Sequence, residues 1–131
     1  MPHVIVEYTT NLKENGNIKS LLLKINQSLI AAGDTFPIGG IRSRAIELHD
    51  YVVADGSNQE DAFVHVTLKI GKGRTEKEKK NACNQVFAAM EQHFEAAFAN
   101  RFLALSLELV EFTHPTYKKN NIHSRYSNPE G

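Results

Sequence analysis

One proline and three arginines are the residues of this sequence whose types and positions best suit chemistry. Pro2 directly follows Met1 and opens the apolar run "VIV". Proline lacks an amide hydrogen and is tolerated at the first residue of a strand, so Pro2 has a structural interpretation. It also has a chemical one, because removal of Met1 would leave Pro2 with a free secondary amine that can act as a base. The neighbouring residues do not decide between the two.

The arginines are candidate anion ligands. Arg42 and Arg44 stand two apart in "GGIRSRA", so they point to the same face of an expected strand. They repel each other there unless an acid or a bound anion lies between them; the alternative is a solvated strand edge. Arg74, in "GKGRTE", comes between a strand and a helix, where helix-start amides and a guanidinium together could bind an anion. The alternative for Arg74 is an ordinary surface arginine.

The other motifs that could carry chemistry are incomplete. "GKGRTE" lacks the third glycine of a dinucleotide-binding turn and contains no GK[ST] phosphate loop. The six histidines show no HxH, HxxxH or HExxH spacing, so we expect no zinc site. Cys83 is the only cysteine, which excludes an internal disulfide, and we expect it to pack within a helix.

The composition limits the class of protein. With 131 residues and 41% hydrophobic content, we expect one domain over residues 1–131. Fifteen basic and fifteen acidic residues cancel, so no overall field would attract nucleic acid or an anionic membrane. The sequence contains no apolar run of membrane-spanning length and no signal-peptide pattern at its start, so we expect a cytoplasmic protein.

Hydrophobic periodicity predicts two similar halves, residues 2–54 and 62–112. In the first half, a strand at 4–8 is followed by a helix between Asn17 and Gly33 and a strand at 41–54. In the second, a strand at 62–70 is followed by a helix from Thr75 to Phe98 and a strand at 103–109. Residues 113–131 read as a polar tail.

This order predicts an α+β fold in which a duplicated β-α-β unit forms a four-stranded mixed sheet. Each helix has a single apolar stripe, so both helices are expected on one face of the sheet. The other face would expose Phe63, Val110 and Phe112 among polar groups, so we expect further copies of the chain to cover it.

Four stretches together resemble one enzyme family. "PHVIVEY", "FPIGGIRSRA", "FVHVTLKIGKGRT" and "NNIH" are similar to 5-carboxymethyl-2-hydroxymuconate isomerases, a branch of the tautomerase superfamily. The resemblance runs from Pro2 to about His123. It implies a homotrimer, cleavage of Met1 and a catalytic base at the Pro2 amine. It also implies that Arg42 and Arg74 match the family's arginines, with Arg44 as a further substrate-binding candidate.

The chemistry of such a reaction suits these residues. Moving a proton between carbons of an unsaturated oxo acid needs a base that is neutral near pH 7. An α-amino group has a reference pKa of about 7.7 to 8.0, and neighbouring guanidinium groups lower it. Arginines can bind carboxylates and stabilise a dienolate, so no metal or organic cofactor is required.

We therefore expect a cofactor-free isomerase acting on a small, multiply carboxylated acid in the breakdown of aromatic acids. Two alternatives remain open from the sequence. One is a keto-enol tautomerase of the same fold with another substrate. The other is a non-catalytic trimeric binding module, in which Pro2 merely begins a strand.

Overall fold

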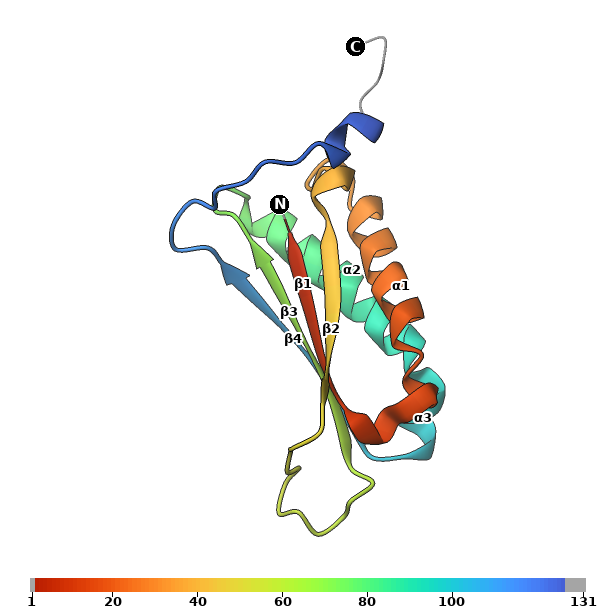
Figure 1. Cartoon of the computed structure of the whole chain (residues 1–131). Coiled ribbons are helices and arrows are strands. Elements are labelled where there is room, and N and C mark those ends of the chain that lie inside the picture. Colours follow the sequence, from red (N-terminus) through yellow and green to blue (C-terminus); the bar gives the residue numbers. More distant parts are fainter. Residues whose placement is uncertain (1, 127–131) are drawn as a thin grey trace.

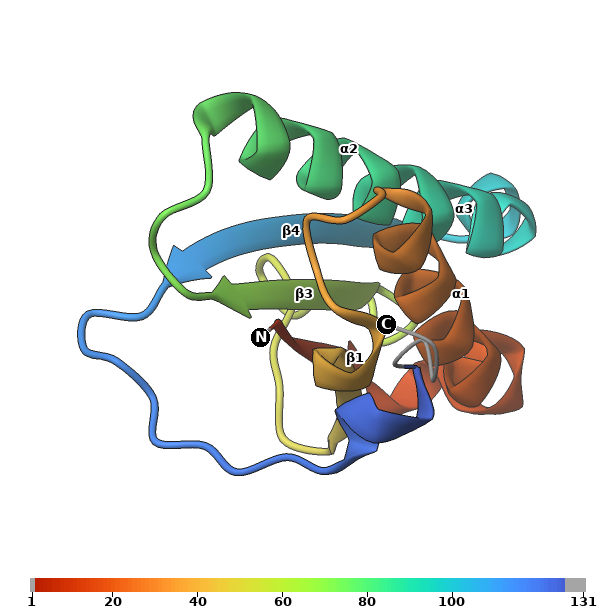
Figure 2. The ribbon, with the colours of Figure 1, turned by 90° about the horizontal axis from the view of Figure 1, so that it is seen from above.

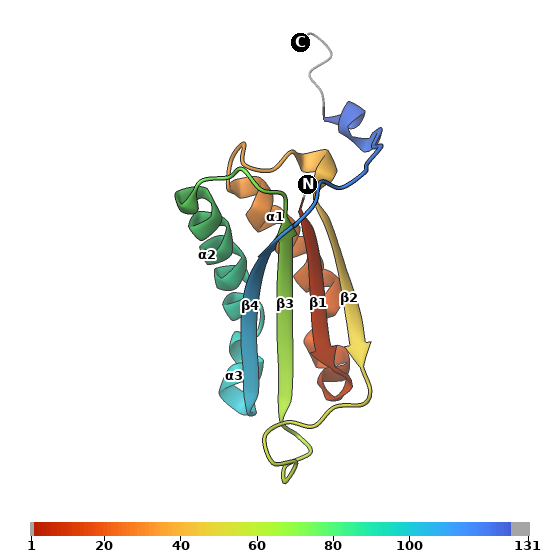
Figure 3. The same cartoon turned by 90° about the vertical axis from the view of Figure 1, so that its left-hand side faces the viewer.

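The structure, a computed structural model, describes residues 2–126. Met1 and residues 127–131, the last part of the predicted polar tail, lie outside the described residues. The chain forms a four-stranded sheet in the order β2-β1-β3-β4 (Figure 3). Its strands are β1 (His3–Thr9), β2 (Arg42–Leu48), β3 (Ala62–Ile70) and β4 (Leu103–Glu111). The pairs β1–β2 and β3–β4 are parallel and the central pair β1–β3 is antiparallel, which confirms the predicted mixed sheet.

The α-helices cover one face of this sheet (Figures 1 and 3). They are α1 (Ile18–Ala31), α2 (Glu76–His93) and α3 (Glu95–Asn100). Three short 3-10 segments accompany them: η1 (Thr10–Gly16), η2 (Ile38–Gly40) and η3 (Ile122–Arg125). The predicted α+β fold is therefore confirmed, with the helices on a single face.

Strict alternation along the central strands produces the core. In β3 every second residue, from Ala62 to Ile70, is buried against the helices, and the residues between them are only half-buried. The apolar stripes of α1 and α2 face the same layer, and burying a large aliphatic side chain contributes roughly 1.5–3 kcal/mol. The fully buried core includes Val4, Val6, Leu21, Ile25, Leu29, Val64, Val66, Leu68, Val86 and Met90.

Two predicted elements are shorter in the structure than in the sequence analysis. The strand predicted over 41–54 ends at Leu48, because β2 pairs only with β1 and Leu48 is the partner of Thr9, the last residue of β1. The helix predicted to reach Phe98 is divided at Phe94, whose φ of −100° and ψ of 15° separate α2 from α3. Neither change alters the order of the elements.

Within residues 2–126, no helix covers the second face of the sheet (Figure 3). We call it the bare face. The strand registers and the alternation of burial show which side chains lie on the bare face. They include His3, Ile5, Glu7, Arg42, Arg44, Ile46, Phe63, His65, Thr67, Lys69, Ser106, Glu108 and Val110. The bare face therefore mixes apolar and charged side chains, as predicted from Phe63 and Val110.

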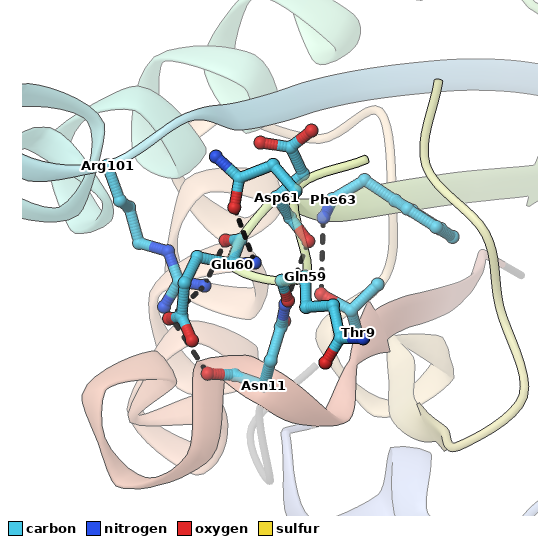
Figure 4. Close-up of polar contacts among 8 residues, drawn as sticks. Thr9, Asn11, Gln59, Glu60, Asp61, Phe63 and Arg101 are labelled. Carbon is cyan, nitrogen blue, oxygen red and sulfur yellow. Dashed lines mark hydrogen bonds and ion pairs between the residues drawn. The ribbon is translucent and has the colours of Figure 1, made fainter. Parts of the chain in front are cut away.

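A polar cluster fastens one end of the sheet to the loop between β2 and β3 (Figure 4). The Asn11 side-chain amide donates to the carbonyl oxygens of Gln59 and Asp61, at 3.1 and 2.8 Å. The Arg101 guanidinium donates to the carbonyl oxygens of Asn11 and Glu60, at 3.3 and 2.6 Å. These bonds satisfy backbone groups that the strands leave unpaired, and they lie at the end of β1 opposite Pro2.

Candidate active site

Pro2 lies at the start of β1, at the end of the sheet where β2 also begins (Figure 1). It is buried, and its carbonyl oxygen accepts a hydrogen bond of 3.2 Å from the backbone N–H of Arg42. Because β1 and β2 are parallel, their first residues are held side by side, and His3 is the register partner of Arg42. The fold thus fixes Arg42 next to Pro2 through the backbone.

Arg42 and Arg44 lie on the bare face, as their spacing predicted. Both are exposed at alternate positions of β2, and their partners in β1 are His3 and Ile5. Arg44 Nη1 lies 3.2 Å from His3 Nδ1. An arginine can only donate, so Nδ1 of His3 accepts this bond and its Nε2 carries the proton.

His3 is held in its neutral form. Burial, followed by the positive charges of Arg44 and Arg42, lowers the pKa of His3 below its ordinary value. Its ring meets the Phe112 ring edge-on, with centroids 6.0 Å apart, and the Lys69 ammonium lies 5.8 Å from the centre of the same Phe112 ring. Lys69 is the register partner of His3 in β3. The end of the bare face nearest Pro2 is therefore rich in cations and apolar rings.

These cations lack acidic partners within the described chain. Among residues 2–126, no carboxylate lies within ion-pair distance of Arg42, Arg44 or Lys69. Cations that gather without an acid repel one another, and an anion placed among them would relieve that repulsion. The arrangement therefore suits the binding of an anionic molecule next to Pro2.

Arg74 lies at the same end of the sheet but on the side of the helices. The antiparallel pairing of β1 and β3 brings the end of β3, and so the loop that carries Arg74, to the start of β1. The Arg74 guanidinium lies 4.5 Å from the ring centre of Phe36, a core residue, and its Nε and Nη1 donate to Thr35 O and Gly71 O at 3.2 and 3.3 Å. These contacts hold the side chain and use two of its five N–H groups, so the second N–H of Nη1 and the two on Nη2 could bind an anion.

The sequence analysis predicted that backbone amides at the start of α2 could bind an anion together with Arg74. For two of these amides, those of Thr75 and Glu78, the prediction is wrong. Thr75 and Glu78 form a capping box, in which Thr75 N–H donates to Glu78 Oε1 at 2.9 Å and Glu78 N–H donates to Thr75 Oγ1 at 3.1 Å. Glu76 and Glu78 also place negative charge in this first turn. An anion bound beside Arg74 therefore could not use the amides of Thr75 and Glu78, which the capping box already occupies.

The structure thus brings Pro2, Arg42 and Arg44 together and places Arg74 across the sheet from the other two arginines. Sequence reasoning missed three neighbours of these residues. His3 is bonded to Arg44, Lys69 is the register partner of His3, and Phe36 packs against Arg74. Alternation along β1 and β3 could have placed His3 and Lys69 on the face of Arg42. The stacking of Phe36 on Arg74 joins segments 38 residues apart in the sequence and has no local signal.

Three further observations concern metal ligands, the single cysteine and membrane-spanning helices. Within residues 2–126, no three His, Cys, Asp or Glu side chains are grouped so that they could hold a metal ion. Cys83 is half-buried, and burial raises the pKa of its thiol. Of the helices described, none has the length and apolar character needed to cross a membrane.

Comparison with known proteins gives consistent matches over nearly the whole chain. A family model for 5-carboxymethyl-2-hydroxymuconate isomerase matches residues 2–126. The chain is 41% identical over 128 residues to the 5-carboxymethyl-2-hydroxymuconate Delta-isomerase of Escherichia coli, which covers 96% of this chain and 99% of that protein.

Solved structures agree with the family match. A 5-carboxymethyl-2-hydroxymuconate isomerase from Deinococcus radiodurans R1 superimposes with a TM-score of 0.91 and 51% identity, covering 97% of this chain and 95% of that one. A fused 4-OT wild type symmetric trimer superimposes with a TM-score of 0.64 and 14% identity, covering 96% of this chain and 99% of that one. The second likeness shows the fold alone.

Proposed function

Because this chain belongs to the 5-carboxymethyl-2-hydroxymuconate isomerase family, we propose that it moves a proton on 5-carboxymethyl-2-hydroxymuconate, with the Pro2 amine as the base. The chain is an isomerase. We further propose roles for Pro2 and for the three arginines, and that the enzyme acts in the breakdown of aromatic acids. The observation that carries it is the pair Arg42 and Arg44, which lies beside Pro2 without a carboxylate partner among residues 2–126.

The base is the secondary amine that Pro2 gains when Met1 is removed. An α-amino group has a reference pKa of about 7.7 to 8.0, so a modest lowering leaves it unprotonated near pH 7. Arg42, held against Pro2 by a backbone hydrogen bond, supplies a nearby positive charge that disfavours the ammonium form. The amine then takes the proton of the 2-hydroxyl group, which leaves a dienolate, and the resulting ammonium returns a proton to a carbon of that dienolate.

The arginines bind the negatively charged groups of the substrate. A carboxymethyl-muconate carries three carboxylates, and loss of a proton places a further charge on the oxygen of a dienolate. In the proposed complex, Arg42 clamps a carboxylate with paired hydrogen bonds and Arg44 supports it. Arg74 is already fixed by Phe36, Thr35 and Gly71, so it can stabilise the dienolate with little loss of side-chain freedom.

The proposal includes a homotrimer in which other copies cover the bare face. The isolated sheet leaves Ile5, Ile46, Phe63 and Val110 without a covering layer. The fused 4-OT protein that shares the fold is a symmetric trimer. Covering the bare face would also exclude water around Arg42 and Arg44, which strengthens their hold on an anion.

One experiment tests this function directly. The purified protein would be assayed on 5-carboxymethyl-2-hydroxymuconate, and the same sample would be analysed by intact mass. We expect isomerisation without added metal or cofactor in a sample whose mass lacks Met1. No isomerisation by a folded sample that lacks Met1 would contradict the proposal and favour a binding module.

A further inference from the structure

The C-terminal segment after β4 begins at, and stays near, the end of the sheet where Pro2 lies, because β4 ends beside the start of β1. From Phe112 it runs along the side of the sheet opposite the helices and ends with η3 against η2 (Figures 1 and 2). The segments that meet are "NNIH" at 120–123 and "PIGG" at 37–40, two of the stretches singled out in the sequence. The mechanism proposed above assigns no role to this contact.

The Asn120 side chain joins the two segments. Asn120 Nδ2 donates a hydrogen bond of 2.8 Å to the carbonyl oxygen of Gly39. Its Oδ1 accepts a hydrogen bond of 2.7 Å from the backbone N–H of Ile122, at the start of η3. The half-buried Asn120 amide therefore donates to the segment at 37–40 and accepts from its own segment.

Gly39 allows this close approach. A Cβ atom at position 39 would lie 2.8 Å from the Cα and 2.9 Å from the backbone nitrogen of His123. Real Cβ atoms do not approach backbone atoms so closely, so any side chain at this position would push η3 away. The turn and η3 are thus packed backbone against backbone.

The turn leads directly to the proposed site. Ile41 N–H donates to the carbonyl oxygen of Ile38 at 3.2 Å, and the next residue, Arg42, donates its N–H to the carbonyl oxygen of Pro2. We propose that Asn120 is a positioning residue, which fixes the turn at 37–41 and thereby holds Arg42 against Pro2. This inference rests on the proposed function, because it assumes that Arg42 binds the substrate.

The test combines three variants with a double-mutant cycle. Asn120→Ala removes both side-chain bonds, whereas Asn120→Asp keeps the acceptor for Ile122 N–H and replaces the donor to Gly39 O with a negatively charged acceptor. Asn121→Ala is the matched control, since Asn121 is exposed and its side chain makes no cap hydrogen bond to η3. Each would be assayed for kcat and KM on 5-carboxymethyl-2-hydroxymuconate, with thermal melting and sedimentation as checks of fold and assembly.

We expect Asn120→Ala and Asn120→Asp to lower kcat/KM by about tenfold, since a small displacement of a positioning group is costly, and Asn121→Ala to have no effect. In an Arg42→Ala background, Asn120→Ala should cause no further loss, because its effect passes through Arg42. If Asn120→Ala does not fold, the kcat/KM of Asn120→Asp tests whether the bond to Gly39 positions Arg42.

Two results would overturn the inference and leave the proposed function intact. These are full activity in a folded Asn120→Asp protein, or an equal loss of kcat/KM from Asn120→Ala in the native and Arg42→Ala backgrounds. A different result would contradict both. If Arg42→Ala alone retains native kcat/KM, Arg42 does not bind the substrate, and Asn120 has nothing catalytic to position.

Discussion

Arg42 and Arg44 show why residue type and position together define this site. Each is an ordinary exposed arginine when considered alone. They become informative because they share a face with His3 and Lys69, lie beside Pro2, and have no carboxylate partner among residues 2–126. Arg74 differs, since its stacking on Phe36 and two backbone hydrogen bonds hold it rigidly.

The arginine roles predict a clear ranking of variants. Arg42→Ala and Arg74→Ala should each lower kcat/KM by roughly 10²–10³, the effect of removing one donor to a developing charge. Arg44→Ala should lower kcat/KM by a smaller factor, because part of the role of Arg44 is its hydrogen bond to His3. Steady-state kinetics would measure the losses, with the exposed Lys19→Ala as a control for the removal of a cation. Near-native activity in both Arg42→Ala and Arg74→Ala would contradict the role of the arginines.

At the scale of elements, His93 joins α2 to α1 and η1. His93 Nε2 donates to the carbonyl oxygen of Gly16 at 2.7 Å, and its Nδ1 accepts from the Lys24 ammonium at 3.1 Å. Burial lowers the pKa of His93 from its usual 6.5, the Lys24 charge lowers it further, and the bond to Gly16 opposes these effects. The neutral ring is therefore the form that fits between the elements.

This linkage predicts that the free energy of unfolding falls as the pH drops. The unfolded chain protonates His93 near pH 6.5, whereas the folded protein does so only at lower pH, so acid favours unfolding below about pH 6.5. Urea unfolding at pH 7.5 and about pH 5.5 would measure the difference. His93→Gln should reduce it, and His3→Gln should reduce it separately, because the pKa of His3 is also lowered. An unchanged pH dependence in both variants would show that neither ring is linked to folding.

The sequence was most informative where a local pattern determines an element. Alternation from Ala62 to Ile70 located β3, and the spacing of Thr75 and Glu78 located the start of α2. The strand predicted through Val52 and Val53 was too long, because β propensity cannot reveal that β1 ends at Thr9 and leaves no partner. The break at Phe94 lacks a proline or glycine signal.

The candidate site was predicted less completely than the fold. The spacing of Arg42 and Arg44 was sufficient to place them on one face. No local pattern could show that Arg74 lies on the other face, since this depends on its contacts with Phe36 and Thr35 across the fold. The contact between Asn120 and Gly39 is equally non-local.

For the whole molecule, the bare face predicts the assembly. We expect a symmetric trimer at micromolar concentration, with three times the 14.7 kDa mass of the chain in sedimentation velocity. Ile5→Lys should dissociate it, because Ile5 lies within the bare face between Arg44 and Thr67. Leu23→Lys is the matched control, since Leu23 is 60% exposed on α1. A monomeric native protein, or an Ile5→Lys protein that stays trimeric, would contradict this assembly.

The central claim is that the free amine of Pro2 is the base of the isomerase. Its most direct test compares the protein that begins at Pro2 with one that carries a single glycine ahead of Pro2, both verified by intact mass. The added glycine turns the amine into an amide, which has no basic lone pair, and leaves the arginines unchanged. We expect the free form to isomerise 5-carboxymethyl-2-hydroxymuconate with a kcat/KM that rises with pH through an apparent pKa below about 8, and the extended form to be inactive. An extended protein that isomerises the substrate at the native rate would show that Pro2 only begins a strand.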